Sequence, residues 1–200
     1  MKIYFVSITD VEENLFDIWY DRMDSEKKAS VLKMQSEHKR KLRIAADMLC
    51  RKGVSEFCGT AENEIAIGYT PAGKPYAKGL PVNFSISHSG DYAVCAVSDI
   101  EIGIDIEKKR TVHPRAYEKF CTESEARYIN GNEDGFFRIW TLKEAYFKCV
   151  GTGLGSDIKD VSFEINGSEI TCSEKGFDFS FFTVDENYIC SICKKTELFR

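Results

Sequence analysis

Apolar and polar residues alternate in several short stretches of the chain, and this period of two predicts β-strands. The first stretch covers residues 2–8, and two more cover 82–87 and 92–97. The segment His88-Ser89-Gly90-Asp91 between the last two predicts a hairpin turn. Residues 100–106 form another alternating run. Short β-rich runs broken by turn residues follow between 161 and 194.

A helical period occupies other parts of the chain. The residues Leu42, Ala45, Ala46, Leu49 and Cys50 follow the i, i+3, i+4 spacing of one buried helix face. Ser36 is expected to cap this helix and Gly53 to end it.

Further along the chain, Thr122-Glu123-Ser124-Glu125 is a capping box that opens a helix. Residues 136–150 predict another helix, which Gly151 and Gly153 end. Residues 59–81 hold four glycines and three of the four prolines, so a surface loop is expected there.

The strand pattern repeats at about half the chain length. Residues 84–87 precede 92–97 in the same way that Phe179-Ser180-Phe181-Phe182 precedes residues 188–193. This similarity predicts two related halves. A chance likeness between short strands is the alternative.

Composition narrows the class of protein. With 43% hydrophobic and 30% charged residues among 200, the chain is globular, and no apolar run is long enough to span a membrane. The stretch 1–10 is read as a strand rather than a secretory signal. The eight cysteines are therefore expected to be reduced thiols of a cytoplasmic protein.

Net charge argues against nucleic acid as a partner, because a chain of net charge −5 lacks an overall phosphate-binding surface. The positive charge is nevertheless segregated: residues 22–52 hold ten Lys or Arg against four Asp or Glu, whereas 10–21 hold five acidic residues and no basic ones. The basic segment is either the solvated face of its helix or a site for anions.

The run 103–107 is the first candidate for chemistry. Asp105 and Glu107 share one face of a predicted strand, and adjacent carboxylates repel each other unless a cation lies between them. An oxygen-seeking ion such as Mg²⁺ fits that need. The alternative is an acidic, solvent-facing side of the strand.

Two more groups of residues join this candidate. Trp140, Glu144 and Lys148 line one helix face, where the last two could form a surface ion pair or serve as a third carboxylate and a phosphate-binding cation. Lys74, next to Pro75, and His88, flanked by serines, could hold phosphate oxygens. Taken alone, each is an ordinary loop residue.

Together these blocks resemble the 4′-phosphopantetheinyl transferase superfamily, in its surfactin-synthetase-type branch of two similar halves in one chain. The shared motifs are Gly73-Lys74-Pro75, residues 84–89, Gly103-Ile104-Asp105-Ile106-Glu107 and residues 140–148 (Trp-Thr-Leu-Lys-Glu-Ala-Tyr-Phe-Lys). The resemblance implies an α+β fold with pseudo-twofold symmetry. Its halves, residues 1–99 and 100–200, would each pack a small antiparallel sheet on helices.

The resemblance also implies site residues. Metal ligands for Mg²⁺ would be Asp105, Glu107 and Glu144. Contacts to coenzyme A would come from Lys27, Arg40, Lys74, Ser87, His88 and Lys148. The N-terminal lysine could instead be Lys28 or Lys33. Asp105, Glu144 and Lys148 would carry catalysis, with Glu144 as the base, directly or through a metal-bound water.

The implied activity is that of a holo-[acyl-carrier-protein] synthase type of enzyme. It would transfer 4′-phosphopantetheine from coenzyme A to a serine of an acyl or peptidyl carrier protein and release adenosine 3′,5′-bisphosphate. A Mg²⁺-dependent nucleotide pyrophosphatase and a non-catalytic module that binds coenzyme A or a carrier domain are the alternatives. A monomer is expected, without nucleic-acid or membrane partners.

Two further features were open to more than one interpretation. Phe120, Cys121 and Tyr128 could form the carrier-docking surface or belong to the core. Cys190 and Cys193 form a CxxC pair, for which packing is favoured over metal binding because a strand points the two sulfurs to opposite faces.

Overall fold

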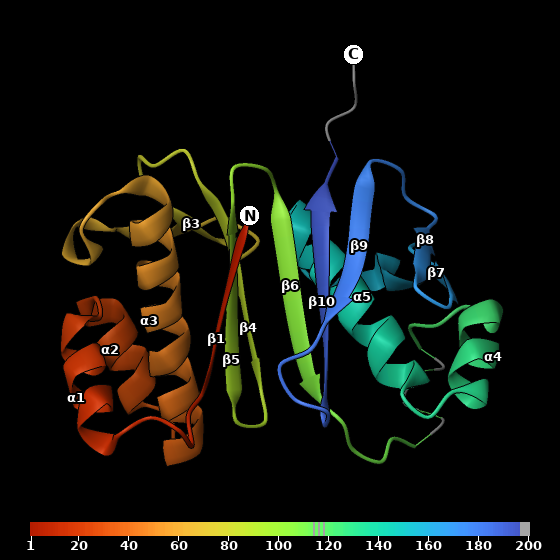
Figure 1. Ribbon diagram of the computed structural model, residues 1–200, viewed down its shortest axis with the longest axis horizontal. Helices are drawn as coiled ribbons and strands as arrows, with labels where there is room; N and C mark the ends of the chain where they lie inside the picture. The colour runs from red at the N-terminus through yellow and green to blue at the C-terminus, as the bar shows by residue number, and fades with distance from the viewer. Residues whose placement is uncertain (114, 116, 118, 197–200) are drawn as a thin grey trace.

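Two three-stranded antiparallel sheets lie side by side in the middle of the molecule (Figure 1). This computed structural model describes residues 1–113, 115, 117 and 119–196, so the end of the predicted second half, 197–200, lies outside the described residues. The first sheet has the order β1 (Lys2–Ser7), β5 (Tyr92–Ser98), β4 (Asn83–Ser89). The second has the order β6 (Ile102–Lys108), β10 (Tyr188–Lys195), β9 (Phe177–Phe182).

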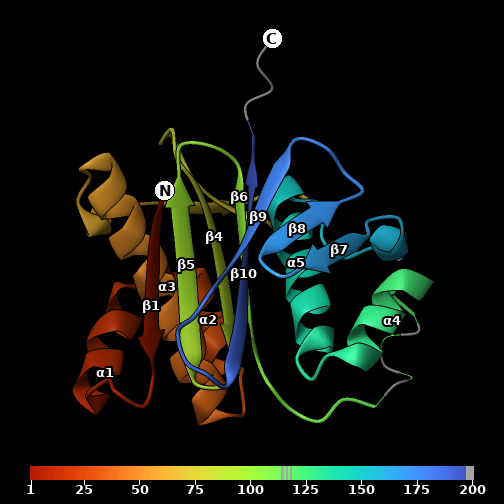
Figure 2. The same ribbon diagram turned by 45° about the vertical axis from the view of Figure 1, so that its right-hand side comes forward.

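Helices cover the outer face of each sheet, as the view turned by 45° also shows (Figure 2). The long helix α3 (Glu37–Cys58) packs on β1, β5 and β4, with α1 (Glu13–Arg22) and α2 (Ser25–Leu32) against it. On the other side α5 (Gly135–Val150) packs on β6 and β10, with α4 (Glu123–Gly131) beside it. The layers therefore run helix, sheet, sheet, helix.

Small elements complete the two halves. The pair β2 (Ile67–Tyr69) and β3 (Pro75–Ala77) belongs to the first, and the pair β7 (Phe163–Asn166) and β8 (Glu169–Cys172) to the second. Short 3₁₀ helices cover Glu62–Glu64 and Ser156–Lys159. No described helix is both long and apolar enough to cross a bilayer.

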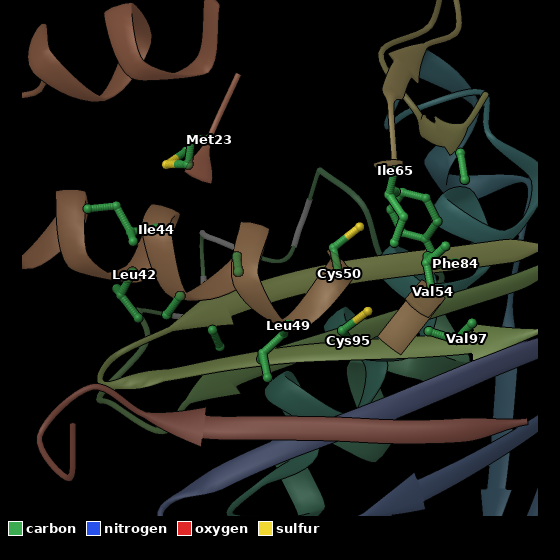
Figure 3. Close-up of a cluster of buried hydrophobic side chains, with 14 of the residues drawn as sticks. Met23, Leu42, Ile44, Leu49, Cys50, Val54, Ile65, Phe84, Cys95 and Val97 are labelled. Atoms are coloured by element: carbon green, nitrogen blue, oxygen red, sulfur yellow. The ribbon is translucent and has the colours of Figure 1, made fainter. Parts of the chain in front are cut away.

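Strand alternation builds the cores on the two faces of each sheet. In β5, Cys95 and Val97 pack against Leu49 and Val54 of α3 (Figure 3), whereas Val94 packs between the sheets. In β10, Cys190 lies in the core between the sheets and Cys193 in the core beneath α5, and both are fully buried. The CxxC pair is thus split between two cores, as the strand pattern predicted, and all eight cysteines are free thiols.

The structure confirms the predicted α+β class and most of the predicted elements, including the Ser36 cap, the capping box at Thr122 and the end of α5 at Gly151. Gly53 was predicted wrongly as a helix end: α3 continues to Cys58, and Gly59 at φ +70° terminates it. A Cβ atom at Gly53 would lie 2.8 Å from Val97 Cγ2, so this glycine permits close packing of α3 on β5.

The stretch 59–81 was also predicted wrongly as a loop throughout, because it contains the β2–β3 hairpin. Its glycines and prolines obscured two strands of only three residues each. The boundary predicted between the halves, at residues 99 and 100, falls in the connection between β5 and β6 and stays a prediction.

Candidate active site

The two sheets meet at their edge strands β4 and β6, and polar side chains fill this junction. Ser87 Oγ donates a 2.7 Å hydrogen bond to Asp105 Oδ1. Lys148 Nζ, from α5, lies 2.6 Å from the same carboxylate oxygen and 2.9 Å from Ser87 Oγ. Three residues from three elements of the two halves therefore converge on one point.

The carboxylates at this point are crowded. Asp105 is 4% exposed, and its second oxygen, Oδ2, is buried without a hydrogen-bond partner among the described residues. Burial, followed by the charge of Asp105, raises the pKa of Glu144 to about 7, and Glu107 adds to the effect. Asp105 is therefore not part of a solvated acidic face, and Lys148 offsets only part of the negative charge of the carboxylates.

The carboxylates of Asp105, Glu107 and Glu144 are the type of ligand that binds a divalent cation, but their present arrangement does not form a metal site. Within the described residues, no group of three or more His, Cys, Asp or Glu side chains is placed to hold a metal ion. The partnerless Asp105 oxygen and the mutual repulsion of the carboxylates nevertheless match the oxygen ligands that Mg²⁺ prefers. In this structure the Lys148 ammonium supplies the positive charge beside Asp105.

A cavity of about 280 Å³ opens beside these residues, and Glu144 and Lys148 line it. Lys74 also lines it, and its ammonium donates a 2.6 Å hydrogen bond to the carbonyl oxygen of Cys149 at the end of α5. Burial lowers the pKa of Lys74. Phe84 and Leu154 give the cavity an apolar side, so it can take a ligand with both charged and apolar parts.

A second cavity of about 480 Å³ is lined by three basic residues of the N-terminal half. Lys27, Arg43 and Lys78 line it. Lys27 is paired with Asp47, and its side chain is only 12% exposed. The predicted phosphate contact at Lys27 thus lies at this cavity, engaged by an internal carboxylate.

Arg43 is a further site candidate, which the sequence analysis did not name beside Arg40. Desolvation, followed by the charge of Arg43 and then that of Lys148, lowers the pKa of His88. Neither the Arg40 nor the Arg43 side chain forms a hydrogen bond or ion pair within the described part of the chain. Both arginines lie on α3, and Arg43 directly follows the buried Leu42. The spacing of apolar residues in the sequence does not say which of the two arginines faces the site.

The helix face predicted from Trp140, Glu144 and Lys148 is present and half-buried along α5. Its N-terminal residue, Trp140, packs against Phe120 with ring centroids 4.8 Å apart. Lys143, which lies between Trp140 and Glu144 in the sequence, is not on this face. Its side chain is fully buried and pairs with Glu125 at 3.1 Å. Lys143 is therefore structural, whereas Lys148 belongs to the site.

The structure decides what Phe120 and Cys121 do. Both are 7% exposed and belong to the core of the C-terminal half, and Tyr128 packs half-buried against that core. Phe120 and Cys121 are therefore core residues and not a docking surface, and Phe120 packs on Phe136 and Trp140 of α5.

Comparison with known proteins gives matches along the whole chain. The profile of the 4′-phosphopantetheinyl transferase superfamily matches residues 101–193, and the profile of a 4′-phosphopantetheinyl transferase N-terminal region matches residues 11–100. A 4′-phosphopantetheinyl transferase of Bacillus subtilis is 32% identical over 170 residues, which cover 75% of this chain and 72% of that one.

Two further matches extend the comparison. A 4′-phosphopantetheinyl transferase of Aneurinibacillus migulanus is 25% identical over 203 residues, covering 96% of this chain and 85% of its own. The solved structure of Thermotoga maritima holo-[acyl-carrier-protein] synthase aligns with 48% of this chain and 63% of its own at a TM-score of 0.42 and 23% identity.

Proposed function

This chain belongs to the 4′-phosphopantetheinyl transferase superfamily, and from that premise we propose that it moves phosphopantetheine from coenzyme A to a carrier-protein serine. The acceptor would be an acyl or peptidyl carrier domain, and adenosine 3′,5′-bisphosphate would leave. The observation that carries the proposal is the convergence of Lys148, Asp105 and Ser87, together with the cavity that Lys148 and Glu144 line.

The proposed chemistry is an in-line displacement at the β-phosphorus of coenzyme A. The serine oxygen forms a bond to that phosphorus, and the bond from phosphorus to the oxygen bridging the two phosphates breaks. The electron pair leaves with adenosine 3′,5′-bisphosphate. Such a transfer needs positioning and charge stabilisation more than covalent help from the protein.

Glu144 is the proposed acceptor of the serine proton. Its pKa of about 7, raised first by burial and then by Asp105, suits a base that works near neutral pH. Lys148 Nζ is held by Asp105 and Ser87 at the cavity, where it can donate to phosphoryl oxygens as their charge grows.

Basic residues around the two cavities would hold the rest of coenzyme A. Lys74 lines the first cavity and Arg43 the second, and the charges of Arg43 and Lys148 both lower the pKa of His88, after desolvation. Anionic phosphates are the ligands that such a set recognises. Lys27 and Arg40 keep their predicted roles as further contacts.

Asp105, Glu107 and Glu144 are the residues that would hold Mg²⁺. When bound, the ion would neutralise the pyrophosphate oxygens. The proposed site lies between two halves of one chain, which supports activity as a monomer.

Mass spectrometry of an apo carrier domain incubated with coenzyme A, Mg²⁺ and the protein tests the proposal. One phosphopantetheine adduct is expected. Glu144→Gln should slow adduct formation at least about 10²–10⁴-fold, because it removes the proposed base and one of the proposed Mg²⁺ ligands, whereas Glu164→Gln, at an exposed glutamate on β7, should not. No adduct on any of several acyl and peptidyl carrier domains would overturn the proposal.

The same samples separate the other activities. Phosphopantetheine released into solution without a protein acceptor would identify a pyrophosphatase. Binding of coenzyme A without Mg²⁺ and without turnover, seen by calorimetry, would identify a binding module.

A further inference from the structure

Three serines of β4 connect the two halves where their edge strands meet. Ser85, Ser87 and Ser89 are spaced two apart, so they project from one face of the strand toward β6. Ser85 Oγ accepts a 3.1 Å hydrogen bond from the amide of Ile104, and Ser87 bonds Asp105. The sheets are thus joined by side-chain hydroxyls rather than by a backbone ladder.

Ser89, like Ser87, both donates and accepts a hydrogen bond. Its hydroxyl donates to Glu107 Oε2 at 2.8 Å and accepts from the amide of Lys108 at 3.1 Å. A hydroxyl has a single hydrogen to donate, so this one is committed to the Glu107 carboxylate. Glu107 has only one other described partner, the guanidinium of Arg110 at 3.5 Å, which is 63% exposed.

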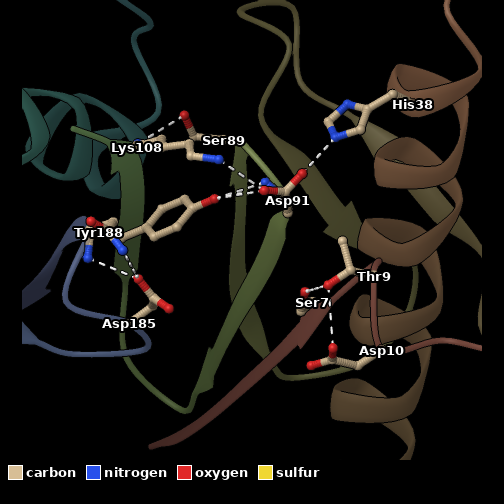
Figure 4. A network of polar contacts seen from close by, with 10 residues as sticks. Ser7, Thr9, Asp10, His38, Ser89, Asp91, Lys108, Asp185 and Tyr188 are labelled. Carbon is tan, nitrogen blue, oxygen red and sulfur yellow. Dashed lines mark hydrogen bonds and ion pairs between the residues drawn. The ribbon is translucent and has the colours of Figure 1, made fainter. Parts of the chain in front are cut away.

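The turn that carries Ser89 is itself held in place from three directions (Figure 4). The Asp91 carboxylate accepts from His38 Nε2 and from Lys108 Nζ, both at 2.9 Å, and the Asp91 amide donates to Tyr188 Oη at 2.9 Å. At Gly90, φ is +55°, and an added Cβ would lie 2.2 Å from Tyr188 Oη. The Ser89 hydroxyl is therefore presented by a turn with little freedom to move.

We propose that Ser89 is a positioning residue that aims the Glu107 carboxylate at the cation site of the proposed transferase. The inference rests on the proposed function, because it gives Glu107 the metal-ligand role assigned there. Hydrogen-bond partners of ligating carboxylates fix their orientation, and their loss typically lowers metal affinity or activity about 10–100-fold. Ser89 touches neither substrate nor metal in this account and acts only through Glu107.

The test is Mn²⁺ binding to the protein with coenzyme A, followed by electron paramagnetic resonance of the free ion, which does not depend on turnover. Ser89→Ala is expected to raise the Mn²⁺ dissociation constant about tenfold or more. Ser89→Thr keeps the hydroxyl and should restore most of the affinity. Ser7→Ala, which removes a buried hydroxyl whose one described partner is Thr9, is the matched control and should bind as the wild type does.

A double-mutant cycle separates positioning from a general structural effect. If Ser89 acts through Glu107, then Ser89→Ala should cause little further loss of Mn²⁺ affinity in the Glu107→Ala background. The Mg²⁺ concentration for half-maximal transfer should also rise in Ser89→Ala more than kcat at saturating Mg²⁺ falls.

Three results would overturn the inference: wild-type Mn²⁺ affinity in Ser89→Ala, multiplicative losses in the double variant, or no Mn²⁺ binding by the wild-type protein. A wild-type protein that fails to modify any carrier domain overturns the proposed function instead. Because that result comes from the transfer assay and not from the metal titration, the two failures are distinguishable.

Discussion

Lys143 and Lys148 lie five positions apart on α5, yet their side chains have different surroundings. The Lys143 ammonium is fully buried and contacts Glu125 and the carbonyl oxygens of Ile158 and Val161. Lys148 is partly exposed at the cavity and contacts Asp105. One lysine fastens α5 to the segment before β7, and the other is available to a ligand.

Replacement of Lys143 should therefore cost stability. Lys143→Met is expected to lower the free energy of unfolding by about 3–5 kcal/mol, because it leaves the buried Glu125 carboxylate without its counter-charge. Urea unfolding followed by circular dichroism measures this. Lys194→Met, which breaks an exposed pair with Asp178, should stay within about 1 kcal/mol of the wild type. Equal effects of the two variants would contradict the assignment.

Arg43 offers a second prediction at the scale of single residues. Desolvation first, and then Arg43, lower the pKa of His88, so Arg43→Met should move that pKa upward toward its ordinary value. Nuclear magnetic resonance titration of the imidazole reports the shift directly. Arg40→Met should change it less, because Arg40 is not among the charges that act on the ring. A larger change in the His88 pKa in Arg40→Met than in Arg43→Met would contradict this account and would favour Arg40 as the nearby charge.

At the scale of elements, the close contact between α5 and β6 brings the residues of the candidate site together. A Cβ atom at Gly103 would lie 1.9 Å from the carbonyl oxygen of Ala145 and 2.5 Å from the amide nitrogen of Cys149. Gly103 lies two residues before Asp105 on the same face of β6, and Lys148 follows Ala145 by three. Close approach at this glycine is what lets Lys148 reach Asp105.

Gly103→Ala is accordingly expected to separate the helix from the strand and to lower stability by at least about 1–3 kcal/mol. Gly131→Ala is the opposite case, because nothing lies within 4 Å of the added Cβ at that last residue of α4. This second change should raise stability by about 0.4–1 kcal/mol by restricting the unfolded chain. Thermal unfolding of both variants tests the pair, and changes of the same sign would refute the packing argument.

At the scale of the whole molecule, Asp91 ties together segments from both halves. Its carboxylate contacts His38 on α3 and Lys108 on β6, and its amide contacts Tyr188 on β10. The hydrogen bond from His38, and then that from Lys108, lower the pKa of Asp91 below its ordinary value of 3.8. The ionised carboxylate is therefore the form that stabilises the junction.

The sign of the pH dependence follows from that shift. A carboxyl group with a lowered pKa in the folded state adds stability above pH 3.8, and the contribution is lost as pH falls through the lower folded value. Asp91→Asn should cost about 0.2–1 kcal/mol at neutral pH, because the partners are largely exposed. Its unfolding free energy should then fall less than that of the wild type on acidification below pH 4. Parallel curves for the two proteins would contradict this account.

The sequence by itself determined most of the local structure. Alternation at 82–87, 92–97 and 100–106 and the caps at Ser36, Thr122 and Gly151 set strands and helices, because these signals act within a few residues of chain. It also supplied the candidate carboxylates and Lys148, since their spacing places them on one strand face and one helix face. The β2–β3 hairpin was missed because strands of three residues carry too little pattern.

Only the tertiary structure decided which residues meet. The packing of edge strand β4 beside β6, the burial of Phe120 and the different surroundings of Lys143 and Lys148 each depend on contacts between segments far apart in the chain. Periodicity says which face of an element is apolar but not which neighbour covers it. The close packing of α5 on Gly103 and the serines of β4 settle that question here, and they bring Lys148, Asp105 and Ser87 to one point.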